Sequence, residues 1–153
     1  MNTFSYIVGL GSTTDVVGQL FDMAYSQHTV GYNEPPSTAL VFVPSPRIVN
    51  TSGINKTFKC DVTMEIETTE NKDQGVEFMC TIDDNNTYNT LTPVGIIDQS
   101  RVRFFFNNVP KTVSWSFITP IASGSGLYFR AANLTKADMD LTVRRFKVSV
   151  SQV

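Results

Sequence analysis

The ten-residue stretch Phe58–Glu67, FKCDVTMEIE, alternates strictly between apolar and polar side chains. Successive side chains of a strand point to opposite faces, so this pattern predicts a strand with one buried and one solvated face. Such half-buried strands are typical of antiparallel sheets. The residues expected to face the core are Phe58, Cys60, Val62, Met64 and Ile66.

Similar alternation recurs along the rest of the chain and predicts an all-β fold. A polar turn follows the first stretch, and we expect Phe58–Glu67 to form a hairpin with Val76–Ile82. Arg101–Asn107 and Thr112–Ile118 are expected to form a second hairpin. Only Asp15–Tyr25 has even a weak helical period. The whole pattern indicates an antiparallel two-sheet jelly roll or β-sandwich of about eight strands. The remaining predicted strands are Leu40–Val43, Leu127–Ala132 and Asp140–Val153.

The last of these strands contains a change of register. Leu141 and Val143 are odd-numbered, whereas Phe146, Val148 and Val150 are even-numbered. One extra residue near positions 144–145 would keep both sets on the core face, which predicts a β-bulge there.

The predicted core and domain limits follow from the same patterns. Two consecutive prolines, Pro35 and Pro36, cannot lie inside a central strand and mark a seam. We therefore expect residues 1–32 to be an N-terminal docking or extension segment and residues 33–153 to be the jelly-roll domain. The side chains expected to be almost fully buried are Val62, Met64, Phe78, Val102, Phe104, Trp115, Phe117, Val143 and Val148.

The composition excludes several classes of protein. Charged residues are 17% of the 153, and the formal net charge is -2, so nothing supports binding of nucleic acid. No apolar run is long enough to insert into a membrane, and no basic flank precedes the first apolar patch as in a secretory signal. Without such a signal, Cys60 and Cys80 are expected to be buried thiols.

The sequence predicts neither a catalytic residue nor a metal or cofactor site, so we expect a protein that is not an enzyme. His28, the only histidine, has no patterned partner that would make it a general base. Asp83–Asn86 lacks the spaced oxygen ligands of a calcium loop and is interpreted as a turn. Glu65, Glu67 and Glu70 are expected to solvate the outer face of their sheet.

Four apolar residues are expected to point away from the core, because they alternate out of step with the core-facing residues of their strands. They are Met79, Phe105, Ile118 and Tyr128. If their strands share one sheet, these side chains gather on its outer face, where an exposed apolar patch favours association. We therefore interpret them as the interface of a closed oligomer.

Three pairs of segments follow one another within residues 29–153. They are Ile48–Gly53 before Phe58–Cys60, Val113–Ile118 before Ile121–Gly124, and Leu141–Val143 before Lys147–Val150. Together they resemble the small jelly-roll domains with tumour-necrosis-factor-like topology found on phage and virus fibres, tail tips and head decorations. This family often has Gly-Asp where this chain has Gly126-Leu127. The resemblance implies a homotrimer on a virion and carries over no ligand residue.

The leading functional prediction is a non-enzymatic structural protein of a virion. It would be a homotrimeric fibre, tail-tip or capsid-decoration subunit, assembled in the host cytoplasm. Its partners would be other copies of itself, other virion proteins through residues 1–32, and a glycan or protein of the host surface.

Two alternatives remain open. The first is a carbohydrate-binding module or lectin, in which Asn86, Tyr88 and Asn89 would face the ligand because Trp115 is predicted to point inward. The second is a small jelly-roll capsid protein, although residues 1–32 contain no Lys or Arg to hold a genome.

The oligomer hypothesis is tested by Phe105→Asp. A charge placed in an apolar interface is expected to dissociate the assembly while leaving the sandwich folded. Light-scattering mass and circular dichroism measure the two effects. An unchanged mass of the assembly would show that Phe105 is not part of the interface.

Overall fold

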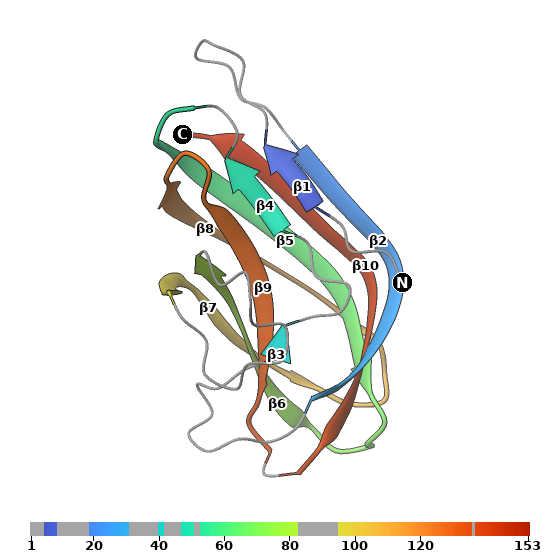
Figure 1. Cartoon of the computed structure of the whole chain (residues 1–153). Coiled ribbons are helices and arrows are strands. Elements are labelled where there is room, and N and C mark those ends of the chain that lie inside the picture. Colours follow the sequence, from blue (N-terminus) through green and yellow to red (C-terminus); the bar gives the residue numbers. More distant parts are fainter. Residues whose placement is uncertain are drawn as a thin grey trace.

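The computed structural model of the chain describes residues 5–8, 19–30, 40–41, 47–50, 53–82, 95–135 and 137–153. These residues form ten strands, and no helix occurs among them. The strands pack as two layers, which face each other across the core (Figure 1). No helix of the described residues has the length and apolarity needed to cross a membrane.

The first layer, sheet A, has the strand order β1-β4-β9-β6-β7, and β3 pairs with β9 beside this path. Its only parallel pair among the described strands is β1 with β4. The strands are β1 Ser5–Val8, β3 Leu40–Val41, β4 Arg47–Asn50, β6 Gln74–Ile82, β7 Ile96–Phe106 and β9 Gly126–Asn133.

The second layer, sheet B, has the order β2-β10-β5-β8 and is antiparallel throughout the described pairs. Its strands are β2 Gln19–Val30, β5 Lys56–Thr68, β8 Lys111–Ile121 and β10 Met139–Gln152. The two packed sheets, antiparallel in all described pairs except β1 with β4, confirm the predicted all-β sandwich.

The predicted hairpins are wrong. β5 belongs to sheet B and β6 to sheet A, and β7 and β8 likewise lie in different sheets. From β5 onward, only β6 and β7 are consecutive strands that pair with each other. Alternation shows that one face of a strand is buried, but a strand of either sheet meets the same core, so the pattern does not select the pairing partner.

The described part of residues 1–32 belongs to the two sheets. β1 pairs with β4, and β2 pairs with β10 from Gln19 to Val30. The described residues of this segment thus add a strand to each sheet, and its role in docking or extension stays a prediction. The weak helical period at 15–25 does not produce a helix in the described residues. From Gln19 onward they form β2, because pairing with β10 outweighs local propensity.

The inward faces of both sheets form one core. Val62, Met64, Phe78, Phe117, Val143 and Val148 are confirmed as buried. Val102, Phe104 and Trp115 are only partly buried, contrary to the prediction. They lie on β7 and β8, the last strands of their sheets, where no further described strand covers the core.

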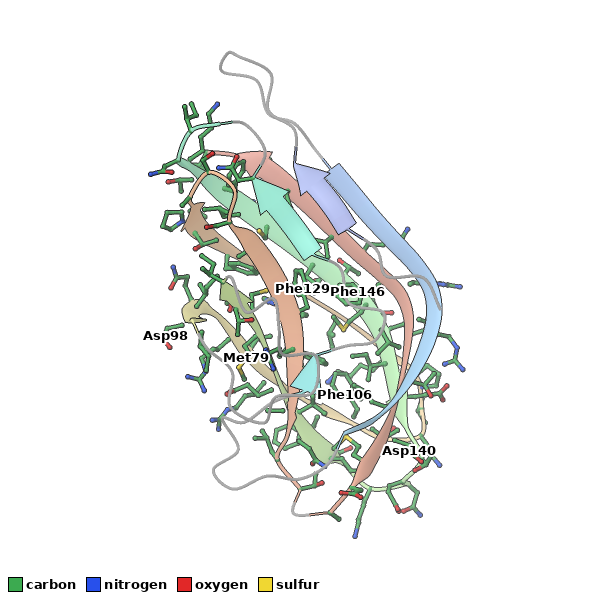
Figure 2. All side chains as sticks on the ribbon, in the orientation of Figure 1. Met79, Asp98, Phe106, Phe129, Asp140 and Phe146 are labelled. Atoms are coloured by element: carbon green, nitrogen blue, oxygen red, sulfur yellow. The ribbon has the colours of Figure 1, made fainter. Side chains whose placement is uncertain are left out.

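Aromatic rings connect the two layers. The Phe129 ring of sheet A meets the Phe146 ring of sheet B edge to face, with centroids 5.4 Å apart (Figure 2). Phe78 of sheet A stacks on Trp115 of sheet B at 5.5 Å and 16°. Offset and edge-to-face pairs of this kind add to the energy of simple burial.

The predicted β-bulge of the last strand is confirmed. The register of β10 against β5 shifts between Arg144 and Lys147, and Arg145 has a φ of 54°. This left-handed conformation places Leu141 and Val143 on the core face before the bulge, and Phe146 and Val148 on it afterwards.

Glycine substitutions test this backbone conformation. A left-handed φ costs a non-glycine residue about 1–2 kcal/mol, whereas glycine in a regular strand costs about 0.5–1 kcal/mol. We expect Arg145→Gly to leave the free energy of unfolding unchanged or to raise it by up to about 1 kcal/mol. The matched control Lys147→Gly should lower it by about 1 kcal/mol. Urea denaturation measures both, and equal losses would contradict the strained bulge.

Candidate functional site

The structure does not bring the four predicted interface residues together. Phe105 is 62% exposed on sheet A and Ile118 is 50% exposed on sheet B, so they lie on different sheets. Met79 is fully buried and packs with Ala132 and Ile96, and so it is not available to a partner. Tyr128 belongs to β9, and its side chain is outside the described part.

The residues predicted to face a carbohydrate lie elsewhere in the chain from the site described below. Asn86, Tyr88 and Asn89 are all outside the described residues, as is the predicted turn Asp83–Asn86. The structure therefore leaves their roles as predictions.

An open hollow of about 520 Å³ lies at one end of the sandwich. Its walls come from the β5–β6 turn, from β7 and from the β9–β10 turn. These two turns lie at the lower end of the molecule in Figure 1. Segments far apart in the sequence thus meet at one place on the surface.

Phe105 forms an exposed aromatic wall of this hollow. It pairs with Gly75 on the outer face of sheet A, the face that points away from the core. A Cβ atom at Gly75 would lie 3.4 Å from Cε1 of Phe105 and 3.3 Å from Cβ of Leu134. The absence of a side chain at Gly75 therefore lets the Phe105 ring lie close to the β6 backbone.

The β9–β10 turn on the other side is held by its own hydrogen bonds. Asn133 is buried, and its Oδ1 accepts from Thr135 N at 2.9 Å and from Thr135 Oγ1 at 2.6 Å. Its Nδ2 donates to Ala137 O at 2.5 Å. Leu134 N in turn donates to Gly75 O at 3.0 Å, which joins this turn to β6. The wall is therefore built before any ligand arrives.

Gln74 supplies an unsatisfied polar atom beside the hollow. Its side chain is nearly buried, and its Oε1 has no hydrogen-bond partner in the described structure. An orphaned buried acceptor costs about 1–3 kcal/mol. Gln74 also lines the hollow, but its Oε1 is covered by other atoms of the protein, so the acceptor lies within the wall and not on its open surface.

Charged groups surround the same opening. Glu70, Asp73 and Asp138 line it together with Lys72, so the described side chains carry an excess of negative charge. Asp73 Oδ1 also accepts from Asn107 Nδ2 at 3.1 Å. Carboxylates and an amide beside an exposed ring can accept hydrogen bonds from hydroxyl groups and pack against an apolar face.

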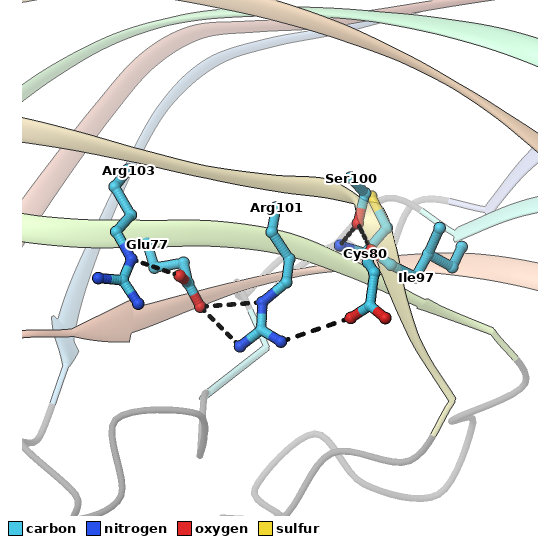
Figure 3. Close-up of polar contacts among 7 residues, drawn as sticks. Glu77, Cys80, Ile97, Ser100, Arg101 and Arg103 are labelled. Carbon is cyan, nitrogen blue, oxygen red and sulfur yellow. Dashed lines mark hydrogen bonds and ion pairs between the residues drawn. The ribbon is translucent and has the colours of Figure 1, made fainter.

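Next to the hollow, Glu77 holds two arginines on the outer face of sheet A (Figure 3). Its Oε2 accepts from Arg103 Nε at 2.7 Å, and its Oε1 accepts from Arg101 Nη2 at 3.0 Å. The Glu77 side chain is only 5% exposed, and a carboxylate so nearly buried needs such partners. Asp98 Oδ1 lies 3.5 Å from Nη1 of Arg101.

Further along the sheet, the outer face is covered. Arg130, Thr81 and Met79 are all fully buried there. Arg130 Nε lies 3.4 Å from Thr81 Oγ1, and burial lowers the pKa of Arg130 to about 10. Among the described residues, the open part of this face is therefore the part that carries Phe105 and Arg103.

A bulge in β7 places Arg101 beside Glu77. The β6–β7 register shifts between Phe78 and Cys80, opposite the segment between Ile97 and Val102. Ser100 closes the gap, because its Oγ accepts from Cys80 N at 2.8 Å and donates to Ile97 O at 2.6 Å. The hydroxyl thus replaces a missing bond of the sheet ladder.

Both cysteines are buried and free, which confirms that prediction. They lie on different sheets, Cys60 on β5 and Cys80 on β6. Burial raises the pKa of Cys60 to about 12, and Asp61 adds to the effect. Burial also raises the pKa of Cys80, so neither thiol is an activated nucleophile.

The other candidates from the sequence stand apart from the hollow. Glu65 and Glu67 pair with Arg145 and Arg144 on sheet B. His28 lies in β2, where its backbone pairs with Leu141 of β10, and its side chain is not described. In the described ranges, no group of three or more His, Cys, Asp and Glu residues could hold a metal ion.

Sequence reasoning missed two parts of this site. The β7 bulge had a signal, because Ile97 is odd-numbered while the inward Val102, Phe104 and Phe106 are even-numbered. The hollow had none, since its walls come from turns that only the folded chain brings together.

No family model and no curated protein matches the sequence, so no sequence match supports the viral part of the resemblance. Among solved structures, a tumour necrosis factor, Eiger, from S. frugiperda is similar with a TM-score of 0.54 and 4% identity, covering 92% of this chain and 94% of that one. A CocE/NonD family hydrolase from Staphylococcus aureus also has a TM-score of 0.54, with 7% identity, covering 91% of this chain and 37% of that chain.

The similar structures also include carbohydrate-binding domains. The xylan-binding domain of Xyn10C from Paenibacillus barcinonensis has a TM-score of 0.41 and 13% identity, covering 71% of this chain and 63% of that one. The two structures with a TM-score of 0.54 support the jelly-roll fold, with tumour-necrosis-factor-like topology at the level of the fold, and do not define a function.

Removing the Ser100 hydroxyl tests the structure of the bulge. Ser100→Ala leaves the buried amide of Cys80 without an acceptor, and we expect the free energy of unfolding to fall by about 1–3 kcal/mol. The control Ser114→Ala, at an exposed position of β8, should change it by less than about 0.5 kcal/mol. Equal effects in urea denaturation would show that the hydroxyl does not support the ladder.

Proposed function

We propose that this protein is a non-enzymatic binding module that holds a carbohydrate in the hollow beside Phe105. The observation that carries the proposal is an exposed aromatic ring, 62% exposed, next to a buried amide and several carboxylates. Sugars present both apolar C–H faces and hydroxyl groups, so this combination matches both parts of the ligand.

Each wall of the hollow has a role in this proposal. The apolar face of a sugar ring packs on Phe105, which Gly75 allows to lie close to the sheet. Hydroxyl groups donate to carboxylates such as those of Glu70 and Asp138. Since the β9–β10 turn is already hydrogen-bonded, this wall needs little ordering on binding.

The proposal differs from the leading sequence prediction in its use of Phe105. A homotrimeric virion subunit would bury this ring against another copy, whereas a binding module leaves it open to a ligand. The virion role, the trimer and a capsid function remain predictions. The carbohydrate proposal rests on the residues of the hollow, and the similarity to the xylan-binding domain adds no argument to it.

Replacing the aromatic wall tests the proposed function. The purified chain is titrated calorimetrically with neutral cello-, xylo-, manno- and chito-oligosaccharides of equal length. We expect at least one to bind, and Phe105→Ala to weaken it about tenfold or more, because the ring buries apolar surface of the sugar.

Ile118→Ala is the matched control, since Ile118 is an exposed apolar residue on the opposite sheet. It should leave the affinity unchanged. Light-scattering mass is measured in parallel. Loss of an assembly in Phe105→Ala without any carbohydrate binding by the parent protein would support the oligomer instead and would overturn this proposal.

A further inference from the structure

We infer that the carbohydrate ligand carries a carboxylate, as a uronic acid does, and that Arg103 binds this group while a neutral sugar unit lies against Phe105. The inference rests on the proposed function and adds the chemical class of its ligand. It follows from the orientation of Arg103, from its place on β7 and from the charge of the hollow.

The guanidinium of Arg103 is held at one edge and open at the other. Its Nε donates to Glu77 Oε2 at 2.7 Å, and the side chain is nevertheless 66% exposed. No other described residue hydrogen-bonds its two Nη atoms. The Nη edge of such a group can donate two parallel hydrogen bonds to one carboxylate.

Glu77 orients Arg103 without neutralising the pair of arginines. The same carboxylate is shared with Arg101, whose Nε and Nη2 both donate to Oε1. Asp98 contacts Arg101 at Nη1, and no ion pair joins it to Arg103 among the described residues. Glu77 and Asp98 thus balance the two guanidinium groups in number, but neither hydrogen-bonds the Nη edge of Arg103, which is free to bind an anion.

Arg103 and Phe105 lie on the same face of β7, since they are two residues apart. Their Cα atoms are separated by about 7 Å in an extended strand. One extended ligand can therefore contact both side chains. Because Glu70, Asp73 and Asp138 outnumber Lys72 in the hollow, an anionic unit is disfavoured there and is directed to Arg103 instead.

The alternative role of Arg103 is protection of an edge. β7 is the last strand of sheet A, and charged side chains on edge strands oppose pairing with other chains. That role depends on the charge of Arg103 and gives the protein no preference among ligands. Ligand selectivity therefore distinguishes the two roles.

The experiment pairs each neutral oligosaccharide with a uronate-bearing counterpart of the same length. Chito-oligosaccharides are compared with alternating N-acetylglucosamine–glucuronate, xylo-oligosaccharides with glucuronoxylan fragments, and cello- and manno-oligosaccharides with chains in which the neutral sugar alternates with glucuronate. Every anionic member thus keeps a neutral unit for Phe105. Calorimetry is performed on the whole chain at low and at high salt. We expect the uronate-bearing member of one pair to bind about tenfold tighter, with a preference that shrinks as salt screens the contact.

Two arginine variants test which side chain produces the preference for the uronate-bearing ligand. Arg103→Gln should abolish it and leave the affinity for the neutral member unchanged. Arg145→Gln removes the same charge from an exposed arginine on sheet B and should preserve it. Phe105→Ala should weaken both members of the pair.

The outcomes distinguish failure of this inference from failure of the proposed function. Binding of a neutral oligosaccharide without a uronate preference, or a preference that survives Arg103→Gln, overturns the inference and leaves the proposed function standing. An equal loss in Arg145→Gln would assign the preference to net charge and would also overturn the inference. If no oligosaccharide binds, both proposals fail.

Discussion

Burial of one face of each sheet against the other is the interaction on which the rest of this structure depends. Phe78 stacking on Trp115, and Phe129 meeting Phe146, join the layers across the core. Each strand must present its apolar side chains to this shared interior, so local backbone irregularities serve the core. The bulge at Arg145 exists because an uninterrupted β10 would turn half of its apolar residues to the outside.

The same constraint produces the candidate site. The bulge in β7 keeps Ile97 inward and, through Ser100, restores the hydrogen bond that Cys80 would lose. It also brings Arg101 beside Glu77, so that the nearly buried carboxylate holds two guanidinium groups. Arg103 lies directly opposite Glu77 in the regular part of the same ladder, and this carboxylate orients it on the open face next to Phe105.

Several parts of the fold could be predicted because they depend on local periodicity. The strand Phe58–Glu67, the sandwich class, the buried cysteines and the bulge in β10 all follow from alternation and its interruptions. The exposure of Phe105 followed from parity as well. Met79 has the same outward parity and is nevertheless buried, because parity gives only the face of a sheet and not what covers that face.

The sequence by itself determined the strands with clear alternation, such as β5, and which side of them is apolar, since these properties depend on neighbours two residues away. It did not predict β2, which has no such alternation. Only the tertiary structure decided which strands pair, because strands of both sheets share one core and carry the same pattern. It also decided that the β5–β6 and β9–β10 turns meet beside Phe105, and that Gln74 is buried there without a partner. Contacts between such distant segments depend on how the sheets are connected and stacked, which no local pattern encodes.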